Sequence, residues 1–496
     1  MSARAASHIH RNRAIRTRIV VKGTLVAETP LHLGAGDAGD VALDLALLRD
    51  PTTRRPLLTG ATLAGAMRAY LDAHGLGCEG KLLFGGKRGE EGGDQSPLVV
   101  DDAVAVDAPA AELRDGVGLD SRSKTATDGA LYGMELWAAG TKFPVVFELS
   151  LESPHDAKDR RKDALHTALG ALTRGEISVG LKKTRGYGRL RLETDAEPVE
   201  VCVYDLASSD GLMKWLCACR QPSKGSKWSK AESDSLSSLD DLGELLPSRR
   251  PSFSISGRFA LDAPLLIRGR SDGSGVDAAH LRARGVDGVV RPALSGTSLA
   301  GALRARARRV LHALHKDLTP KAREDVVDGM FGRDARRDEN GLLHSPLASR
   351  LVVGENYVSN GTTDLYQNRI RIDRFTAGVV DSALFDENPV YPKDDGSTSV
   401  PIVLRLRDPQ PHEIGLLLHL VKDLWTGDLP VGGTTSVGRG SLLGKHVTLN
   451  YTGGDSPLNG VIKREGKGAG VTLDGLAAEQ LNCYSEALAT WVEAGE

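Results

Sequence analysis

The chain has 496 residues, of which 40% are hydrophobic and 26% charged, so it can bury a sizeable core and wholesale disorder is excluded. Its 63 basic and 65 acidic residues give a net charge of -2, which by itself argues mildly against a nucleic-acid-binding protein. Five cysteines do not make a disulfide scaffold, and no apolar run is long enough to cross a bilayer. We therefore expect a cytoplasmic protein with no membrane partner.

The chain contains an internal duplication. Residues 56–68 (PLLTGATLAGAMR) and 292–304 (PALSGTSLAGALR) are closely similar, and five further blocks recur in the same order. The repeat predicts a first domain at 15–204 and a second at 251–450. The Ser/Lys/Asp-rich residues 205–250 are typical of a linker, and 451–496 of a C-terminal helical tail.

Hydrophobic periodicity predicts the same order of elements in both copies. The first copy has predicted strands at 17–26, 144–151 and 188–193 and helices at 62–73 and 163–172. The second has strands at 252–259, 400–406 and 441–450 and helices at 297–314 and 413–426. This order predicts an α+β protein of two tandem ferredoxin-like or RRM-like (βαββαβ) domains with long insertions.

A glycine-rich loop precedes the last strand of each copy, with four glycines at identical spacing in 175–188 and 427–440. Such loops expose backbone N–H groups that can hold phosphate oxygens, although a tight turn is the simpler explanation. Neither loop fits the G-x-x-x-x-G-K-[ST] nucleotide pattern, so an ATPase is disfavoured. The candidate RNA-binding residues in the two loops are Lys182, Lys183, Arg185, Gly186, Gly188, Thr434, Thr435, Gly438, Arg439 and Gly440.

The start of the first helix in each copy is a second candidate RNA contact. Unpaired amides at a helix start attract anions, so we expect Thr62 and Arg68, and in the second copy Ser298 and Arg304, to face RNA, while neighbouring small residues pack. His32 is either an RNA-contacting acid–base group or, as we favour, a structural residue. Cys217-Ala218-Cys219 has no clear fourth ligand, so no zinc is expected.

Three segments together resemble the RAMP superfamily of CRISPR proteins. They are LHLGAG (31–36), LDLALLRDPTTRRPLLTGATLAGAMR (43–68) and GLKKTRGYGRLRL (180–192). The chain resembles most the backbone subunit of type III effector complexes, and its two fused copies resemble the double-backbone subunit of type III-D. The resemblance implies that the partners are a CRISPR guide RNA, a target RNA and other effector subunits.

The resemblance also implies where the target RNA would be cut. In that family an aspartate six residues before an Asp-Pro pair, here Asp50-Pro51, is needed for cleavage with a divalent cation. That residue is Asp44, the expected catalytic and metal-binding residue, with Mg²⁺ or Mn²⁺ as cofactor. The counterpart in the second copy is Asp277, with Asp272 and Asp287 as rivals.

A protruding hairpin in each copy is implied to interrupt base pairing between guide and target. The matching segments are 115–128 and 369–381, and the residues expected at the interruption are Arg122, Thr125, Arg374 and Phe375.

Other functions remain open at the level of sequence. A non-catalytic structural backbone subunit would bind the same RNAs and leave cleavage to its partners. A guide-RNA-processing endoribonuclease would cut precursor RNA alone and without metal. A metabolic enzyme is disfavoured, because no compact catalytic constellation repeats with the fold.

Overall fold

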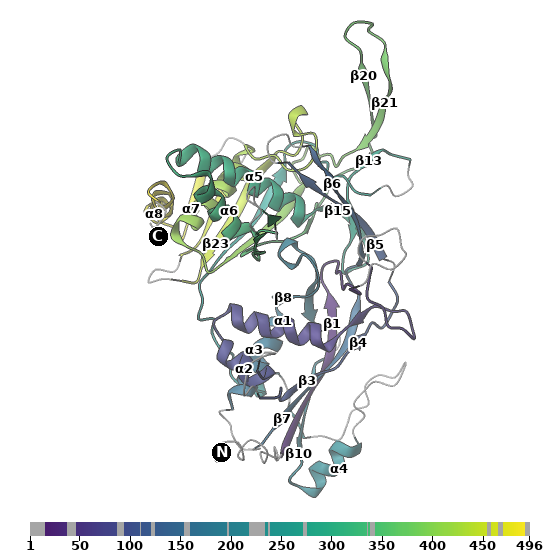
Figure 1. Ribbon diagram of the computed structural model, residues 1–496, viewed down its shortest axis with the longest axis vertical. Coiled ribbons are helices and arrows are strands. Elements are labelled where there is room, and N and C mark those ends of the chain that lie inside the picture. Colours follow the sequence, from purple (N-terminus) through teal and green to yellow (C-terminus); the bar gives the residue numbers. More distant parts are fainter. Residues whose placement is uncertain are drawn as a thin grey trace.

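The computed structural model describes residues 15–36, 46–86, 94–109, 111–120, 125–152, 159–195, 198–217, 234–236, 239–270, 275–334, 336–337, 343–453, 458–464 and 470–491. They form two α+β domains that follow one another along the chain. The first domain lies at the bottom of Figure 1 and the second at the top.

Both domains have the strand order of a ferredoxin-like fold. In each sheet the four core strands are antiparallel neighbours, in the order β3-β7-β1-β9 in the first domain and β18-β22-β12-β23 in the second. The predicted fold class is therefore confirmed, including its tandem repetition. The core strands of the first domain are β1 (Thr17–Ala27), β3 (Leu98–Val100), β7 (Lys142–Leu151) and β9 (Arg189–Leu192). Those of the second domain are β12 (Ser252–Leu261), β18 (Leu351–Val353), β22 (Ser399–Arg407) and β23 (Leu442–Tyr451).

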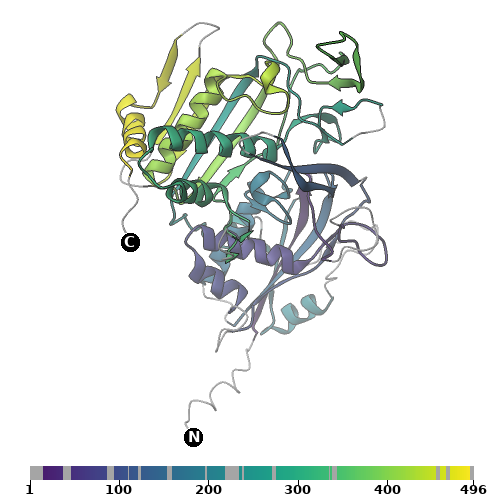
Figure 2. The same ribbon diagram turned by 45° about the horizontal axis from the view of Figure 1, so that its top comes forward.

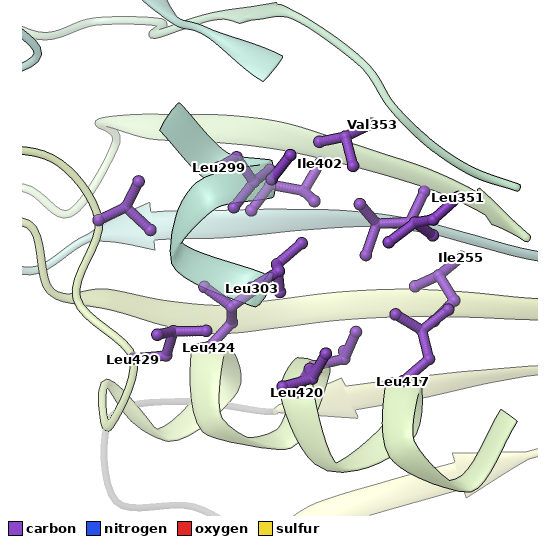
Figure 3. Packing of buried hydrophobic residues seen from close by; sticks show 14 of the residues in the cluster. Ile255, Leu299, Leu303, Leu351, Val353, Ile402, Leu417, Leu420, Leu424 and Leu429 are labelled. Carbon is purple, nitrogen blue, oxygen red and sulfur yellow. The ribbon is translucent and has the colours of Figure 1, made fainter. Parts of the chain in front are cut away.

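Helices cover one face of each sheet and enclose its hydrophobic core. Figure 3 shows this core in the second domain, where Leu299 and Leu303 of one helix and Leu420 of another pack over the strands. Burial of these leucines gains roughly 1.5–3 kcal/mol per side chain, which drives the helices onto the sheet. The helices are α1 (Gly60–Ala73), α2 (Gly77–Phe84) and α3 (Arg160–Thr173), and then α5 (Gly296–Leu314), α6 (Pro320–Phe331) and α7 (Pro411–Thr426).

The repeated Thr/Ser-Gly pair explains where α1 and α5 begin. The hydroxyls of Thr59 and Ser295 accept the N–H groups of Thr62 and Ser298, at 3.3 and 3.2 Å. The next residue is glycine because the helix starts directly over a strand. A Cβ at Gly60 would lie 1.9 Å from the carbonyl oxygen of Val100.

The structure corrects one detail of the sequence repeat. Ser96-Pro97-Leu98 aligns by sequence with Ser345-Pro346-Leu347, but the strand that pairs with β22 starts at Leu351, as β3 starts at Leu98 on β7. Ser96 therefore corresponds to Ser349. Both serine hydroxyls donate to the carbonyl oxygen two residues later, at 2.7 Å in each domain.

Much of the segment expected to be a linker belongs to the first domain. The sheet of the first domain is extended by β10 (Glu200–Asp205) and β11 (Asp234–Leu236), and α4 (Ser209–Cys217) follows β10. Leu242 is buried, and His166 Nδ1 donates to the carbonyl oxygen of Gly243 at 2.6 Å. The chain therefore leaves the first domain only near residue 250.

The C-terminal tail contains strands as well as the expected helix. The second sheet continues through β24 (Leu458–Arg464) and β25 (Val471–Asp474), and α8 (Ala478–Ala489) then packs on α7 (Figure 2).

The remaining elements lie in the segments between the core strands and helices. In the first domain they are β2 (Leu57–Leu58), β4 (Ala103–Val104), β5 (Ala111–Leu119), β6 (Ala126–Trp137), β8 (Ile177–Ser178), η1 (Lys183–Arg185) and η2 (Leu239–Asp241). In the second they are β13 (Ala278–Ala279), β14 (Arg282–Arg284), β15 (Val290–Leu294), β16 (Arg336–Arg337), β17 (Leu343–His344), β19 (Asn356–Tyr357), β20 (Gln367–Ile372), β21 (Val379–Asn388) and η3 (Thr435–Val437).

A buried ion pair joins the two domains. Arg114 on β5 donates to both carboxylate oxygens of Glu355, at 2.5 and 3.0 Å, and both residues are buried. The Arg114 guanidinium also lies over the Tyr187 ring, 5.3 Å from its centroid. Glu355 and the surrounding acidic and phenolic groups hold the pKa of Arg114 well above its ordinary value, against the effect of burial.

We expect Glu355→Gln to destabilise the protein by roughly 3 kcal/mol, because it removes the bidentate partner of a buried guanidinium and leaves Arg114 only the ion pair with Glu112 at 3.0 Å. Urea unfolding followed by circular dichroism measures the loss. Asp287→Asn is the matched control, since Asp287 pairs with Arg291 on the exposed surface and should leave the unfolding midpoint near wild type. Equal midpoints for the two variants would contradict a stabilising role of the buried pair.

Candidate nucleic-acid interface

The two glycine-rich loops have the same backbone shape. Lys182 and Thr434 both adopt a left-handed conformation, with φ of 54° and 53°, and each is followed by one turn of 3₁₀ helix, η1 or η3. Gly186 and Gly438 then turn left-handed again, at φ of 90° and 84°. The glycines are thus required by the backbone, and the repeated shape is compatible with both a tight turn and a phosphate-binding loop.

The first loop is docked on the second domain. Arg185 Nη2 donates to the carbonyl oxygen of Phe331 at 2.6 Å, and Nη1 lies 3.4 Å from that of Leu351. A Cβ on Gly186 would approach the backbone nitrogen of Glu355 to 2.2 Å. Burial, and then the charge of Arg304, lower the pKa of Arg185 to about 10. Arg185, predicted as a phosphate contact, therefore holds the two domains together.

The neighbouring lysines differ in exposure. Lys182 is half-buried, donates to the Tyr132 hydroxyl and lies over the Tyr132 ring, 4.3 Å from its centroid. Burial lowers the pKa of Lys182 to about 8. Lys183 is exposed, so of the three predicted cations in this loop it is the best placed for a phosphate group.

The second loop exposes uncharged residues to solvent, whereas its one cation is buried. Ser436, Val437 and Gly438 are exposed, and Thr434 and Thr435 are half-buried. Arg439, a candidate RNA-binding residue and the cation of this loop, is buried and pairs with Glu387 at 2.8 Å. It therefore anchors the loop to the base of a hairpin. Gly188 and Gly440 are also buried, and a Cβ on either would collide with a carbonyl oxygen about 2 Å away, that of Val179 or Val431.

Both predicted hairpin segments form antiparallel strand pairs. β5 pairs with β6 and β20 pairs with β21, so both hairpins extend beyond the predicted limits. The second projects away from the body of the protein in Figure 1. Gly129 and Ser382, at matching positions of the repeat, are both left-handed, with φ of 73° and 58°.

The tip of the second hairpin is held in one shape by an aspartate. Asp373 Oδ1 accepts the N–H groups of Phe375 and Thr376, at 2.9 and 2.8 Å, and these bonds lower the pKa of Asp373. The Phe375 side chain is 98% exposed, and Arg374 beside it is also exposed. In the first hairpin Thr125 is exposed and Arg122 lies outside the described residues.

Two residues predicted to contact RNA already have partners within the protein. His32 is buried and donates through Nδ1 to the carbonyl oxygen of Glu135 at 2.7 Å, which fits the structural role that the sequence favoured. Arg304 pairs with Asp328 at 2.5 Å between α5 and α6.

The other helix-start residues are only partly accessible. Thr62 and Ser298 share hydroxyl hydrogen bonds with the capping residues Thr59 and Ser295, at 2.8 and 2.9 Å. Arg68 is half-buried, and among the described residues its Nε has no hydrogen-bond partner.

The candidate catalytic aspartates differ in exposure and in their hydrogen-bond partners, and two of them lie outside the described residues. Asp44 lies outside the described residues; Gly34 and Leu47, which are described on either side of it in the chain, form a β-bridge. Asp277 is exposed, and its Oδ2 accepts the N–H of Asp386, near the base of the second hairpin, at 3.0 Å. Of its rivals, Asp272 is outside the described residues. Asp287 pairs with Arg291, whose hydrogen bond lowers the pKa of Asp287 to about 2.

Both domains line a cleft of about 720 Å³ beside Asp277. The first domain supplies Ala111, Glu112 and Leu113 from β5. The second supplies Val276 and Ala279, which lie on either side of Asp277 in the chain, together with Arg270, Arg282, Tyr366 and Asn388. Arg270 also reaches Asp115 of the first domain at 3.6 Å. Sequence reasoning missed this cleft because no local pattern shows that β5 packs against the second copy.

These features define a tandem ferredoxin-like protein in which glycine-rich loops and hairpins recur. The RAMP superfamily model matches residues 24–191 and 261–442, so the chain belongs to the RAMP superfamily of CRISPR-associated RNA-binding proteins. No curated protein matches the chain. Across the described ranges, no helix is both long and apolar enough to span a membrane.

We expect RNA affinity to fall as the pH rises from 7 to 9. With a pKa of about 8, the Lys182 ammonium is charged below that pH and loses its attraction for phosphate above it. Fluorescence anisotropy with labelled single-stranded RNA measures the effect. Lys182→Arg keeps its charge throughout and should flatten the profile. An equally steep fall in that variant would contradict the assignment.

We also expect the two loops to differ in their ionic contribution. Lys183→Ala should reduce the slope of log affinity against log salt by about 0.7, the share of one phosphate on a single strand. Thr435→Ala, at the matching position of the second loop, should weaken binding less and leave the slope unchanged. Binding measured over a salt series separates the two, and equal slope changes would refute the asymmetry.

Proposed function

We propose that this protein is a guide-RNA-binding backbone subunit of a type III CRISPR ribonucleoprotein and that it cleaves the complementary target RNA. The observation that carries the proposal is the duplicated unit of glycine-rich loop and hairpin, with Asp277 at the base of the second hairpin beside a cleft. Two such units in one chain support a double-backbone subunit of the type III-D kind, which works together with other effector subunits.

In the proposed reaction the RNA supplies its own nucleophile. The ribose 2′-oxygen bonds to the adjacent phosphorus, the bond from phosphorus to the 5′-oxygen breaks, and the 2′-hydroxyl proton passes to a base. The departing 5′-oxygen takes up a proton from water. The products end in a 2′,3′-cyclic phosphate and a 5′-hydroxyl. Attack requires an in-line arrangement that a regular A-form helix disfavours, so a base-paired target must be distorted where it is cut.

The second hairpin is suited to cause that distortion. Its tip is held by Asp373, and it presents an almost fully exposed aromatic ring, Phe375, next to Arg374. An aromatic ring can stack on an unpaired base, and an adjacent guanidinium can neutralise the backbone beside it. In this proposal the hairpin opens the duplex and the aspartate near its base acts on the exposed backbone.

The donor chemistry of Asp277 fits a divalent cation. Among the described residues no group of three His, Cys, Asp or Glu side chains could hold a metal ion by itself. Mg²⁺, however, commonly binds one or two carboxylates together with substrate phosphates. Mg²⁺ or Mn²⁺, when bound, would neutralise charge on the scissile phosphate. Asp277 would hold that ion through Oδ1, because its Oδ2 accepts the Asp386 N–H. Asp44 would do the same in the first copy.

A non-catalytic structural backbone subunit is the second candidate. It is favoured by the involvement of Arg185, Arg304 and Arg439 in internal contacts, which makes these repeated residues architectural. A guide-processing endoribonuclease gains no such support, because His32, its proposed acid–base group, is buried against Glu135.

We expect Asp44→Ala and Asp277→Ala each to abolish one cut in a reconstituted complex without changing guide binding. Mapping of the product ends by gel and mass spectrometry assigns each cut to one aspartate, and a chelator should remove both. Asp394→Ala is the control: it removes an exposed aspartate outside the loops, hairpins and cleft, and it should leave both cuts in place. If neither alanine variant changes any product, the chain is the structural subunit and the catalytic proposal fails.

A further inference from the structure

A second basic surface lies where the two domains meet. The chain crosses between the domains on the side away from the β20–β21 hairpin (Figure 1). Here Arg405 and Arg407 stand on the same face of β22, two residues apart, opposite the core side formed by Leu404 and Leu406. Arg350 is a backbone neighbour of Arg407, since the N–H of Arg407 donates to the carbonyl oxygen of Arg350 at 3.2 Å.

The first domain adds further groups to this surface. His74, which follows the last turn of α1, lies against Tyr70, with the ring centroids 4.0 Å apart and the ring planes tilted by 31°. Its Nδ1 donates to the Tyr70 carbonyl oxygen at 2.7 Å. Arg174 lies beside them, with its Nη2 3.5 Å from the Tyr70 hydroxyl. We call His74, Arg174, Arg405 and Arg407 the junction site.

Acidic groups do not balance the charge of the junction site. Glu176 lies 3.7 Å from Arg405, but it also pairs with Arg174 at 3.0 Å and accepts the Tyr70 hydroxyl at 2.6 Å. Across the described residues, Arg407 has no carboxylate partner. Its Nη2 donates only to the carbonyl oxygen of Ser349, at 2.8 Å, and its Nε is buried without a partner.

The charges of the junction site shift the pKa values of its members. Burial, and then the charges of Arg405 and Arg350, lower the pKa of Arg407. Burial also lowers the pKa of His74, and the charge of Arg405 acts in the same direction. Arg405 and Arg407 are half-buried, and a partly desolvated guanidinium without a counter-charge is unfavourable, so an anion between these side chains would stabilise the arrangement.

We propose that the junction site binds a phosphate group through Arg405 and Arg407, and that in the working protein this phosphate belongs to an RNA backbone. Guanidinium groups are suited to a phosphate because their N–H groups point at two of its oxygens at once. Arg174 directly precedes the first glycine-rich loop, but the junction site includes none of the loop or hairpin residues assigned to RNA above, and it does not depend on target cleavage. It would give the protein a second RNA-contacting surface that spans both domains.

The test compares the double variant Arg405→Gln/Arg407→Gln with Arg309→Gln, which removes an exposed charge on α5. The first probe is inorganic phosphate, with chloride at the same ionic strength as reference. In wild type and Arg309→Gln, phosphate should raise the melting temperature and the pKa of His74 followed by NMR. In the double variant phosphate should change neither the melting temperature nor the pKa of His74.

The second probe is labelled single-stranded RNA. The slope of log affinity against log salt should fall by about 0.7 in the double variant and should be unchanged in Arg309→Gln.

The outcomes separate the possible sources of the anion. A phosphate effect with no difference in RNA slope would show a site for a free anion and would overturn the RNA assignment. The absence of any phosphate effect on the His74 pKa in wild type would overturn the site itself. Without ligand, the double variant should melt no lower than wild type at low salt, because the substitutions remove like-charge repulsion. A lower melting temperature would assign Arg407 a structural role through Ser349 and contradict the proposal.

Discussion

The docking of the first glycine-rich loop on the second domain is the constraint on which the rest of the structure depends. Arg185 reaches backbone carbonyl oxygens across the boundary, and Gly186 permits an approach that any side chain would block. Close by, Arg114 and Glu355 form a buried ion pair. Because a buried charge is costly once its partner is removed, these contacts hold the domains in one relative orientation.

That orientation creates the surfaces to which function is assigned. The cleft beside Asp277 exists only because β5 of the first domain packs against the second. The junction site exists for the same reason, since His74 and Arg174 come from one domain and Arg405 and Arg407 from the other. Two domains joined flexibly would have the same residues but neither surface.

The duplication also shows how one fold diverges in chemistry. The loop with three cations faces a neighbouring domain, and two of those cations have become partly buried. The loop that has lost them keeps the same left-handed residues and is exposed at Ser436, Val437 and Gly438. Backbone shape is therefore the shared property of the repeat, whereas charge follows from what each copy contacts.

The sequence by itself determined the duplication and the ferredoxin-like order of strands and helices, whereas both hairpin segments were located only by the resemblance to the RAMP superfamily. The duplication and the order of elements follow from local signals: apolar periodicity, the capping Thr59 and Ser295, and glycines where φ is positive. It did not determine the role of a cation such as Arg185, Arg304 or Arg439. Each was equally compatible with a phosphate contact and with an internal bond. Only the tertiary structure decided between them, because the partners Phe331, Asp328 and Glu387 are distant in the chain.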